Sequence, residues 1–338
     1  MPFRPTRTAS RNNMIKWKKA WRGIAAAALV AVPALAAGAY PDKPVKIVVP
    51  YSAGGSSDLI ARAIGEQLGA ELGQPVVVEN RAGAGSMIGT AYVSAEAPDG
   101  YTLLLADVPF TIVPALYGDR VKYDARRAFA PIALVGLSPM YLFAGPGYAG
   151  KGVAELVADA RARPGVVSIG SGGNGSLTHL LAELFMLNTQ TRLVHVPYKS
   201  AAASVSDLAG GQIDISFSSM PSAAALFQAG KVRPLAVSSP QRQPATPDVP
   251  TFQESGLPNL TVQSWWGLMA PAGTPQAVLD RLGAAMGKVM QAPAIAQRYA
   301  GIGANVPAQT DAQALQSLLS ADFDRWQDVV GRAGIKLE

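Results

Sequence analysis

The sequence contains no cysteine, and this absence removes several kinds of site at once. Without a thiol the chain can form no disulfide, carry no cysteine nucleophile and offer no cysteine ligand to a metal. Histidine is nearly absent too, with only His179 and His195 among 338 residues. Neither a His-Glu-x-x-His zinc motif nor a Gly-x-Ser-x-Gly elbow occurs, so we expect no metal site and no enzyme activity.

Acidic residues are missing from the first 39 positions, which hold seven of the 29 lysines and arginines. An apolar run begins at Gly23 and ends before the small-x-small sequence Ala-Gly-Ala at 37–39. This pattern predicts a cleaved signal peptide at 1–39 and a mature chain that begins at Tyr40. The alternative is a membrane anchor, but the run is shorter than the ~20 residues of a spanning helix and contains Pro33.

The surplus of positive charge disappears with this segment. The whole chain has 29 basic and 23 acidic residues, a formal net charge of +6, and removal of seven basic residues leaves 22 against 23, a net charge of −1. This balance indicates neither a nucleic acid nor an acidic membrane as a partner. No later run is long and apolar enough to span a bilayer, so we expect a soluble mature chain with no direct membrane insertion.

Short apolar runs alternate with helical patterns from Lys46 onward, which predicts a parallel sheet with crossover helices. A second series of the same kind follows the Gly-Pro-Gly turn at 145–147. The last two amphipathic helices have no strands of their own and must cover a sheet formed earlier. We therefore expect an α/β chain with two lobes. Its parts are 40–142 in lobe 1, 143–262 in lobe 2 and 263–338 back in lobe 1, with crossings near 140–145 and 262–267.

Three turns between a strand and a helix are rich in glycine, so each could present unpaired backbone N–H groups to an anion. They are YSAGGSSD at 51–58, NRAGAGS at 80–86 and GSGGNGS at 170–176. Ser56 or Ser57 is the expected N-cap of the first helix, and Ser176 that of the third. The plainer interpretation is that these glycines serve only packing and turn geometry.

The third turn also fits the dinucleotide fingerprint G-x-G-x-x-G on Gly170, Gly172 and Gly175. It lacks the acidic residue about 20 positions further on that binds a ribose hydroxyl, since His195 and Tyr198 stand there. No Gly-Lys-Ser or Gly-Lys-Thr follows any of the turns, as a phosphate-binding loop of the Walker type requires. The remaining hypothesis is a cradle for a small anion, and a carboxylate suits it as well as a phosphate.

Four polar residues near the turns have two interpretations each. His179, at the third position after the Ser176 cap, could face the third turn, whereas His195 inside a strand is interpreted as structural. Lys199 could supply a charge at the sheet edge, although a solvated lysine is the default. We expect Asp58 to support the N-terminus of its helix and not to catalyse.

Several segments together resemble the Bug family of periplasmic solute receptors, the extracytoplasmic component of tripartite tricarboxylate transporters. They are YPDKPVKIVVPYSAGGSSDLIARAI, VVVENRAGAGSMIGT, APDGYTLL, GNGSLTHLLAELF, HVPYKSAAASVSDLAGGQIDISF and SWWGLMAPAGTP. The resemblance covers the whole mature chain. It implies a two-lobed α/β periplasmic binding protein of type II, the Venus-flytrap fold, with a mostly parallel sheet in each lobe and two hinge crossings.

The resemblance also implies where a ligand is held. In the family, carboxylate groups are gripped by the turn after the first strand and by the glycine-rich turn of the second lobe. In this sequence the matching positions are Tyr51, Ser52, Ala53, Gly54, Gly55 and Asp58 in the first lobe and Ser171, Gly172, Gly173, Ser176 and His179 in the second, bordered by Tyr198 and Lys199. The chain departs from the family at Ala82, Ser86, Ser200, Ala202 and Ala203, which stand where the family has a proline and glycines.

The function implied by the resemblance is that of a non-catalytic periplasmic receptor without cofactor or metal. It would capture a small carboxylate as a monomer and pass it to membrane transporter subunits. The same receptor could instead feed a sensor kinase and have no transport role, and the sequence leaves this alternative open. It also leaves open which organic acid is bound.

Overall fold

The computed structural model describes residues 1–3 and 40–335 of the chain. Contacts divide the chain into a unit at 1–40 and a unit at 41–338, and the helices and strands described below all belong to the second unit. The expected signal peptide at 1–39 lies almost wholly outside the described residues.

A parallel three-stranded sheet forms first, as the alternation of strands and helices predicts. Its strands lie in the order β2-β1-β3. Helix α1 buries the apolar side chains that recur at every fourth position, Ile60, Ile64, Leu68 and Leu72. The elements are β1 (Val45–Val49), α1 (Ser56–Leu72), β2 (Val76–Asn80), α2 (Met87–Ser94), β3 (Thr102–Asp107) and α3 (Pro109–Tyr117).

A second parallel sheet follows, with its strands in the order β6-β5-β7. Helix α6 packs on β7 and β5, and α5 packs on the same two strands and on β6. The elements are α4 (Val153–Ala162), β5 (Ser168–Ser171), α5 (Leu177–Thr189), β6 (Val194–Pro197), α6 (Ala201–Ala209), β7 (Ile215–Ser219), α7 (Met220–Gln228) and β8 (Arg233–Val237).

Two long antiparallel strands, β4 (Phe129–Ala144) and β9 (Gln263–Pro271), join these sheets into one mixed nine-stranded sheet. The first part of β4, up to Pro139, pairs with β9, and its last part, from Met140, pairs with β7 and β8. Strand β4 therefore passes from one lobe to the other at this point, just before the crossing expected near 140–145. The domain boundaries at 142 and 262 stay a prediction.

Strand directions determine which ends of the two sheets meet. Strands β3 and β4 are both antiparallel to β9, so β1 to β3 run with β4 toward the second lobe, whereas β5 to β7 run against it toward the first. The carboxyl ends of both parallel sheets therefore face each other. Trp266 of β9 pairs with Asp107 of β3 on one side and with Gly136 of β4 on the other, so Asp107 and Gly136 lie at the same height along the sheet. Ser219 of β7 pairs with Met140 of β4. Four residues of strand, or about 13 Å, separate those levels.

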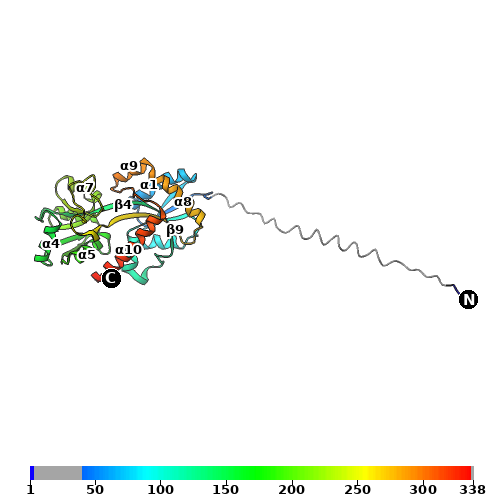
Figure 1. Ribbon diagram of the computed structural model, residues 1–338, viewed down its shortest axis with the longest axis horizontal. Coiled ribbons are helices and arrows are strands. Elements are labelled where there is room, and N and C mark those ends of the chain that lie inside the picture. Colours follow the sequence, from blue (N-terminus) through cyan, green and yellow to red (C-terminus); the bar gives the residue numbers. More distant parts are fainter. Residues whose placement is uncertain (4–39, 336–338) are drawn as a thin grey trace. The chain divides into compact units, whose positions relative to one another are not determined.

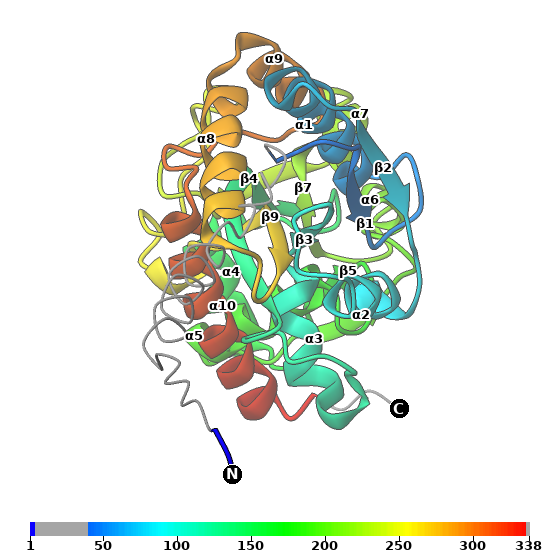
Figure 2. The same ribbon diagram turned by 90° about the vertical axis from the view of Figure 1, so that its right-hand side faces the viewer.

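Helices cover both faces of the first sheet (Figure 2). Helices α8 (Gln276–Gln291) and α9 (Pro293–Gly301) pack on α1, whereas α10 (Ala312–Ala333) packs on α3, β4 and also α5. Two neighbouring tryptophans of β9 donate hydrogen bonds to helices on opposite faces of the sheet. The indole N–H of Trp265 donates to Asp322 of α10 at 2.7 Å, and that of Trp266 donates to Ser57 of α1 at 2.9 Å. Figure 1 shows β4 running from α1 and α8 toward α4, α5 and α7.

Candidate ligand-binding site

The first glycine turn leads into a helix whose N-terminus has no side-chain cap. Gly55 occupies the N-cap position of α1, so the expected cap by Ser56 or Ser57 is wrong. In the part of the chain that the structure describes, the backbone N–H groups of Ser56, Ser57 and Asp58 have no acceptor. The turn is exposed from Ser52 to Ser56. Unpaired amides at a helix N-terminus carry partial positive charge, so this end of α1 can bind an anion.

Asp58 holds the first turn together, as the sequence predicts. One of its carboxylate oxygens accepts from the Gly54 N–H at 2.9 Å and from Arg62 Nε at 3.0 Å, and the other accepts from Asn80 Nδ2 at 3.0 Å. Asn80 also donates to the Tyr51 carbonyl. Burial acts to raise the pKa of Asp58, but these bonds outweigh it and lower the pKa. Gly54 therefore allows the turn by adopting a left-handed torsion, φ 88°, and its own N–H is already bonded to Asp58.

Asp107 ends β3 beneath the first turn of α1, and the sequence analysis missed it. Its carboxylate accepts from the Tyr51 hydroxyl at 2.6 Å and from the Ser57 hydroxyl at 3.2 Å. Ser57 must donate here because its oxygen already accepts from Trp266. The side chain is only partly exposed, and desolvation raises the pKa of Asp107 to about 7. The signal that could have found it is its position, since ligands bind beyond the carboxyl ends of parallel strands.

The second glycine turn, between β2 and α2, takes left-handed backbone torsions at residues other than glycine. Ala84 has φ 47° and Ser86 φ 83°, so Ser86 keeps a conformation that favours glycine. Its side chain is 2% exposed. Burial and the neighbouring Asp107 raise the pKa of Tyr51, and the nearby Ser86 hydroxyl only partly opposes this shift. The Ser86 hydroxyl makes no hydrogen bond of ordinary geometry.

The third glycine turn, at the carboxyl end of β5, is closed by its own hydrogen bonds. Gly172 N–H donates to Thr178 Oγ1 at 2.8 Å, and Gly173 N–H donates to Ser171 Oγ at 3.1 Å. Ser176 caps α5 by accepting from the His179 N–H, which confirms the predicted cap. The amides that the resemblance assigns to a carboxylate are thus already paired within the turn.

The two histidines form a stacked pair beside this turn. Their ring centroids are 4.1 Å apart and the planes are inclined by 12°. Gly175 N–H donates to His179 Nδ1 at 3.0 Å, which leaves the ring hydrogen on Nε2, toward Glu183. His195 Nε2 is 2.7 Å from Ser171 Oγ. Burial, and then the neighbouring His179, lower the pKa of His195 to about 4, in agreement with its structural interpretation.

The corner at 198–199 borders the third turn. Tyr198 N–H donates to the Ser171 carbonyl at 3.1 Å, and a Cβ on Gly173 would come within 2.9 Å of the Tyr198 carbonyl. Gly173 holds φ 113°, so both space and torsion require glycine there. Lys199 is exposed, and its role toward a ligand stays a prediction.

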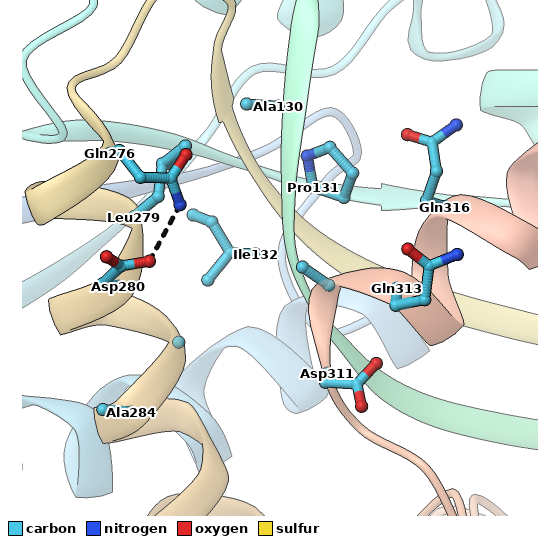
Figure 3. Close-up of a pocket in the computed structure, with 12 residues that line it drawn as sticks. Ala130, Pro131, Ile132, Gln276, Leu279, Asp280, Ala284, Asp311, Gln313 and Gln316 are labelled. Atoms are coloured by element: carbon cyan, nitrogen blue, oxygen red, sulfur yellow. Dashed lines mark hydrogen bonds between the residues drawn. The ribbon is translucent and has the colours of Figure 1, made fainter.

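A well-formed cavity lies away from all three turns. It has a volume of about 550 Å³ and opens between α8, the start of β4 and the start of α10. Figure 3 shows Ile132 and Pro131 of β4 between Asp280 of α8 and Asp311 at the start of α10. Asp311 caps α10, and Asp280 accepts from Gln276, so both carboxylates have structural partners. Within the described ranges, no cluster of metal-binding side chains occurs and no helix has the length and apolarity to cross a membrane.

The fold is that of a two-lobed periplasmic binding protein of the Venus-flytrap type. Superposition with the periplasmic binding protein BugD gives a TM-score of 0.71 at 34% sequence identity, over 88% of this chain and all of BugD. The MatC protein of Rhodopseudomonas palustris, whose structure contains bound malate, gives 0.71 at 30% identity, over 86% of this chain and all of MatC.

The chain belongs to the tripartite tricarboxylate transporter family receptors, whose family model matches residues 60–335. It is 35% identical to protein BugT of Bordetella pertussis over 93% of this chain and 96% of BugT. The family is described as the receptor of a tripartite tricarboxylate transporter, and BugD, one of the related solved structures, is a periplasmic binding protein.

Proposed function

We propose that this protein captures a small organic acid between its two lobes and delivers it, as a monomer, to the membrane subunits of a tripartite transporter. The uncapped N-terminus of α1 carries this proposal. Its three unpaired amides lie beyond the carboxyl end of β1, on the side that faces the second lobe.

A carboxylate completes this N-terminus better than water does. Completing a helix cap is worth about 0.5–2 kcal/mol, and the helix dipole favours a negative charge at this end. Asp58 cannot serve as the cap because its oxygens already bind Gly54, Arg62 and Asn80. The ligand carboxylate takes the place of the side-chain cap that Gly55 cannot provide.

The third turn serves as a preformed wall of the second lobe. The amides of Gly172, Gly173 and Gly175 are paired to Thr178, Ser171 and His179. A ligand therefore meets the side of the turn and the amides that have no acceptor among the described residues, those of Asn174, Leu177 and Thr178. Bound malate in MatC supports a carboxylic acid as the ligand class.

Substitution at Gly55 tests this proposal directly. Gly55 has φ −79°, and a Cβ there would approach only the Ser52 carbonyl, at 3.8 Å, so other residues fit. In Gly55→Asn the amide oxygen caps α1 from within the chain, which raises stability by a few tenths of a kcal/mol and occupies the ligand's amides. Gly55→Ala is the matched control, because it adds a Cβ but no cap.

The measurement is the rise in melting temperature with a panel of organic acids. Wild type and Gly55→Ala should shift with the same acids, and Gly55→Asn should lose the shift while melting higher without ligand. An unchanged ligand shift in Gly55→Asn would show that α1 does not hold the carboxylate. A shift with nucleotides and with no acid would overturn the carboxylate class.

A further inference from the structure

Asp107 is an acid in a region that we assign to acidic ligands, and it lacks a cationic partner. It accepts hydrogen bonds from two hydroxyls, those of Tyr51 and Ser57. No lysine, arginine or histidine among the described residues contributes to the shift of its pKa. The other acid of the turn, Asp58, differs because Arg62 pairs with it at 2.9 Å.

The hydroxyl hydrogens around Asp107 have fixed directions. The indole of Trp266 can only donate, so Ser57 Oγ accepts from it and turns its own hydrogen toward Asp107. Tyr51 donates from the other side at 2.6 Å. When it is ionised, Asp107 is therefore the final acceptor of the network, and a group that reaches its remaining lone pairs must then be a donor.

Ser57 also brings this acceptor next to the unpaired amides. Its backbone N–H is one of the three open donors of α1, and its hydroxyl touches Asp107. Donors for a carboxylate and an acceptor for a cation thus meet at one residue. An α-amino acid carries its carboxylate and its ammonium group on one carbon, which matches this arrangement.

Ser86 provides an independent observation. Its buried hydroxyl has no hydrogen-bond partner and lies beside Tyr51, on the wall formed by the second glycine turn. Buried polar groups in native proteins are nearly always paired, so an orphaned hydroxyl here indicates a polar group supplied from outside the protein.

We propose that the first lobe recognises the head group of an α-amino acid, with the carboxylate on the amides of α1 and the ammonium group on Asp107. This inference rests on the proposed function and names its ligand class. Asp107 is then the residue that determines specificity. An acid without the ammonium group would bring its own carboxylate next to the Asp107 carboxylate with no positive charge between them, and should bind more weakly.

The experiment uses triplets of ligands with one carbon skeleton. Each triplet contains an amino acid, the matching 2-hydroxy acid and the unsubstituted acid, for example aspartate, malate and succinate, or phenylalanine, phenyllactate and phenylpropionate. Isothermal titration of the wild type should rank amino acid, hydroxy acid and unsubstituted acid in that order, with about 10- to 100-fold between the first and last. The amino acid should also bind more tightly at pH 8 than at pH 6, because Asp107 is then ionised.

Asp107→Asn should remove the advantage of the amino acid. The matched control is Asp322→Asn, which alters another buried acid that accepts from a tryptophan, on the opposite face of β9, and should leave the ranking unchanged. Tighter binding of the unsubstituted acid by the wild type would overturn the assignment of Asp107 and leave the carboxylate receptor intact. Persistence of the amino-acid advantage in folded Asp107→Asn would do the same. Failure of every acid in every triplet to bind would refute the proposed function itself.

Discussion

Protonation of His195 is expected to destabilise the second lobe in mild acid. The folded protein holds the pKa of His195 at about 4, against an ordinary value of 6.5. The unfolded chain therefore binds more protons between these values, and the free energy of unfolding falls as pH drops from 6.5 toward 4. Above pH 6.5 the full stability is present.

The structure gives the size of this effect. A charged His195 ring would stack on His179 at 4.1 Å, and its Nε2 could only donate toward Ser171 Oγ. The pKa difference corresponds to at most about 3 kcal/mol, and to about 2 kcal/mol between pH 7 and pH 5. Because the ring is partly exposed, solvent screening reduces the latter to roughly 1–2 kcal/mol.

His195→Gln isolates this contribution, because an amide group replaces Nε2 beside Ser171 without a titrating ring. Urea unfolding of both proteins at pH 7 and pH 5 gives two stability losses, and the wild-type loss should be larger by 1–2 kcal/mol. Other titrating groups cancel in this comparison. The chain has only two histidines, so NMR titration of their imidazoles is assigned by the same variant. Parallel pH dependences of stability, or an imidazole of His195 that titrates near pH 6.5, would refute the reasoning.

Three further predictions follow from the turns and the crossing strands. Gly54→Ala should lower the free energy of unfolding by about 1–2 kcal/mol because of its positive φ alone. Gly173→Ala should lower it more, because its Cβ would also lie 2.9 Å from the Tyr198 carbonyl oxygen. Equal losses of stability in urea unfolding would contradict this steric clash. Trp266→Phe should lower the unfolding free energy by about 1 kcal/mol through loss of the bond to Ser57, and no change would show that this bond is dispensable. The radius of gyration in small-angle scattering should fall when ligand is added to ligand-free protein, and a constant value would rule out closure of the lobes.

The sequence predicted the parallel strands and their crossover helices well, because hydrophobic periodicity is a local property. It missed β4, whose sequence contains Pro131, Gly136 and Pro139. Such residues normally argue against a strand. In the structure the pairing register with β9 shifts beside Pro131 and Gly136, and β4 changes partners after Pro139. Pro131, Gly136 and Pro139, which make this strand hard to recognise in the sequence, are therefore also the residues at which it changes register or partner.

The starts of three helices are hard to recognise in the sequence for a related reason. Helices α3, α7 and α9 all carry proline at the first or second position, and α3 has a second one at Pro114. Proline there is compatible with a helix because the first N–H groups have no intrahelical acceptor. Because proline inside a helix breaks it, a proline at the first turn conceals the start of these helices in the sequence.

The sequence predicted the glycine turns, but not their hydrogen bonds, and the ligand-binding residues stay a prediction. The glycine pattern located the turns at 51–58 and 170–176, yet it could not show that Thr178 and Ser171 occupy the amides of the second. Those contacts depend on side-chain rotamers and on the packing of α5 against β5. Asp107 was missed because no short motif marks the end of a buried strand.

The two turns differ in a way that bears on lobe closure. Helix α5 has a side-chain cap from Ser176, whereas α1 has none. Completing a cap is worth about 0.5–2 kcal/mol and placing a negative charge at the dipole about 0.3–1 kcal/mol, so the N-terminus of α1 alone provides roughly 3 kcal/mol at most. That is less than the 4.1 kcal/mol of a millimolar complex. Tight binding therefore requires contacts from the second lobe, and those contacts exist only when the carboxyl ends of β3 and β7 approach one another. A ligand that touches both lobes in the closed arrangement and one lobe in the open arrangement shifts the population toward closure by that difference in contact energy.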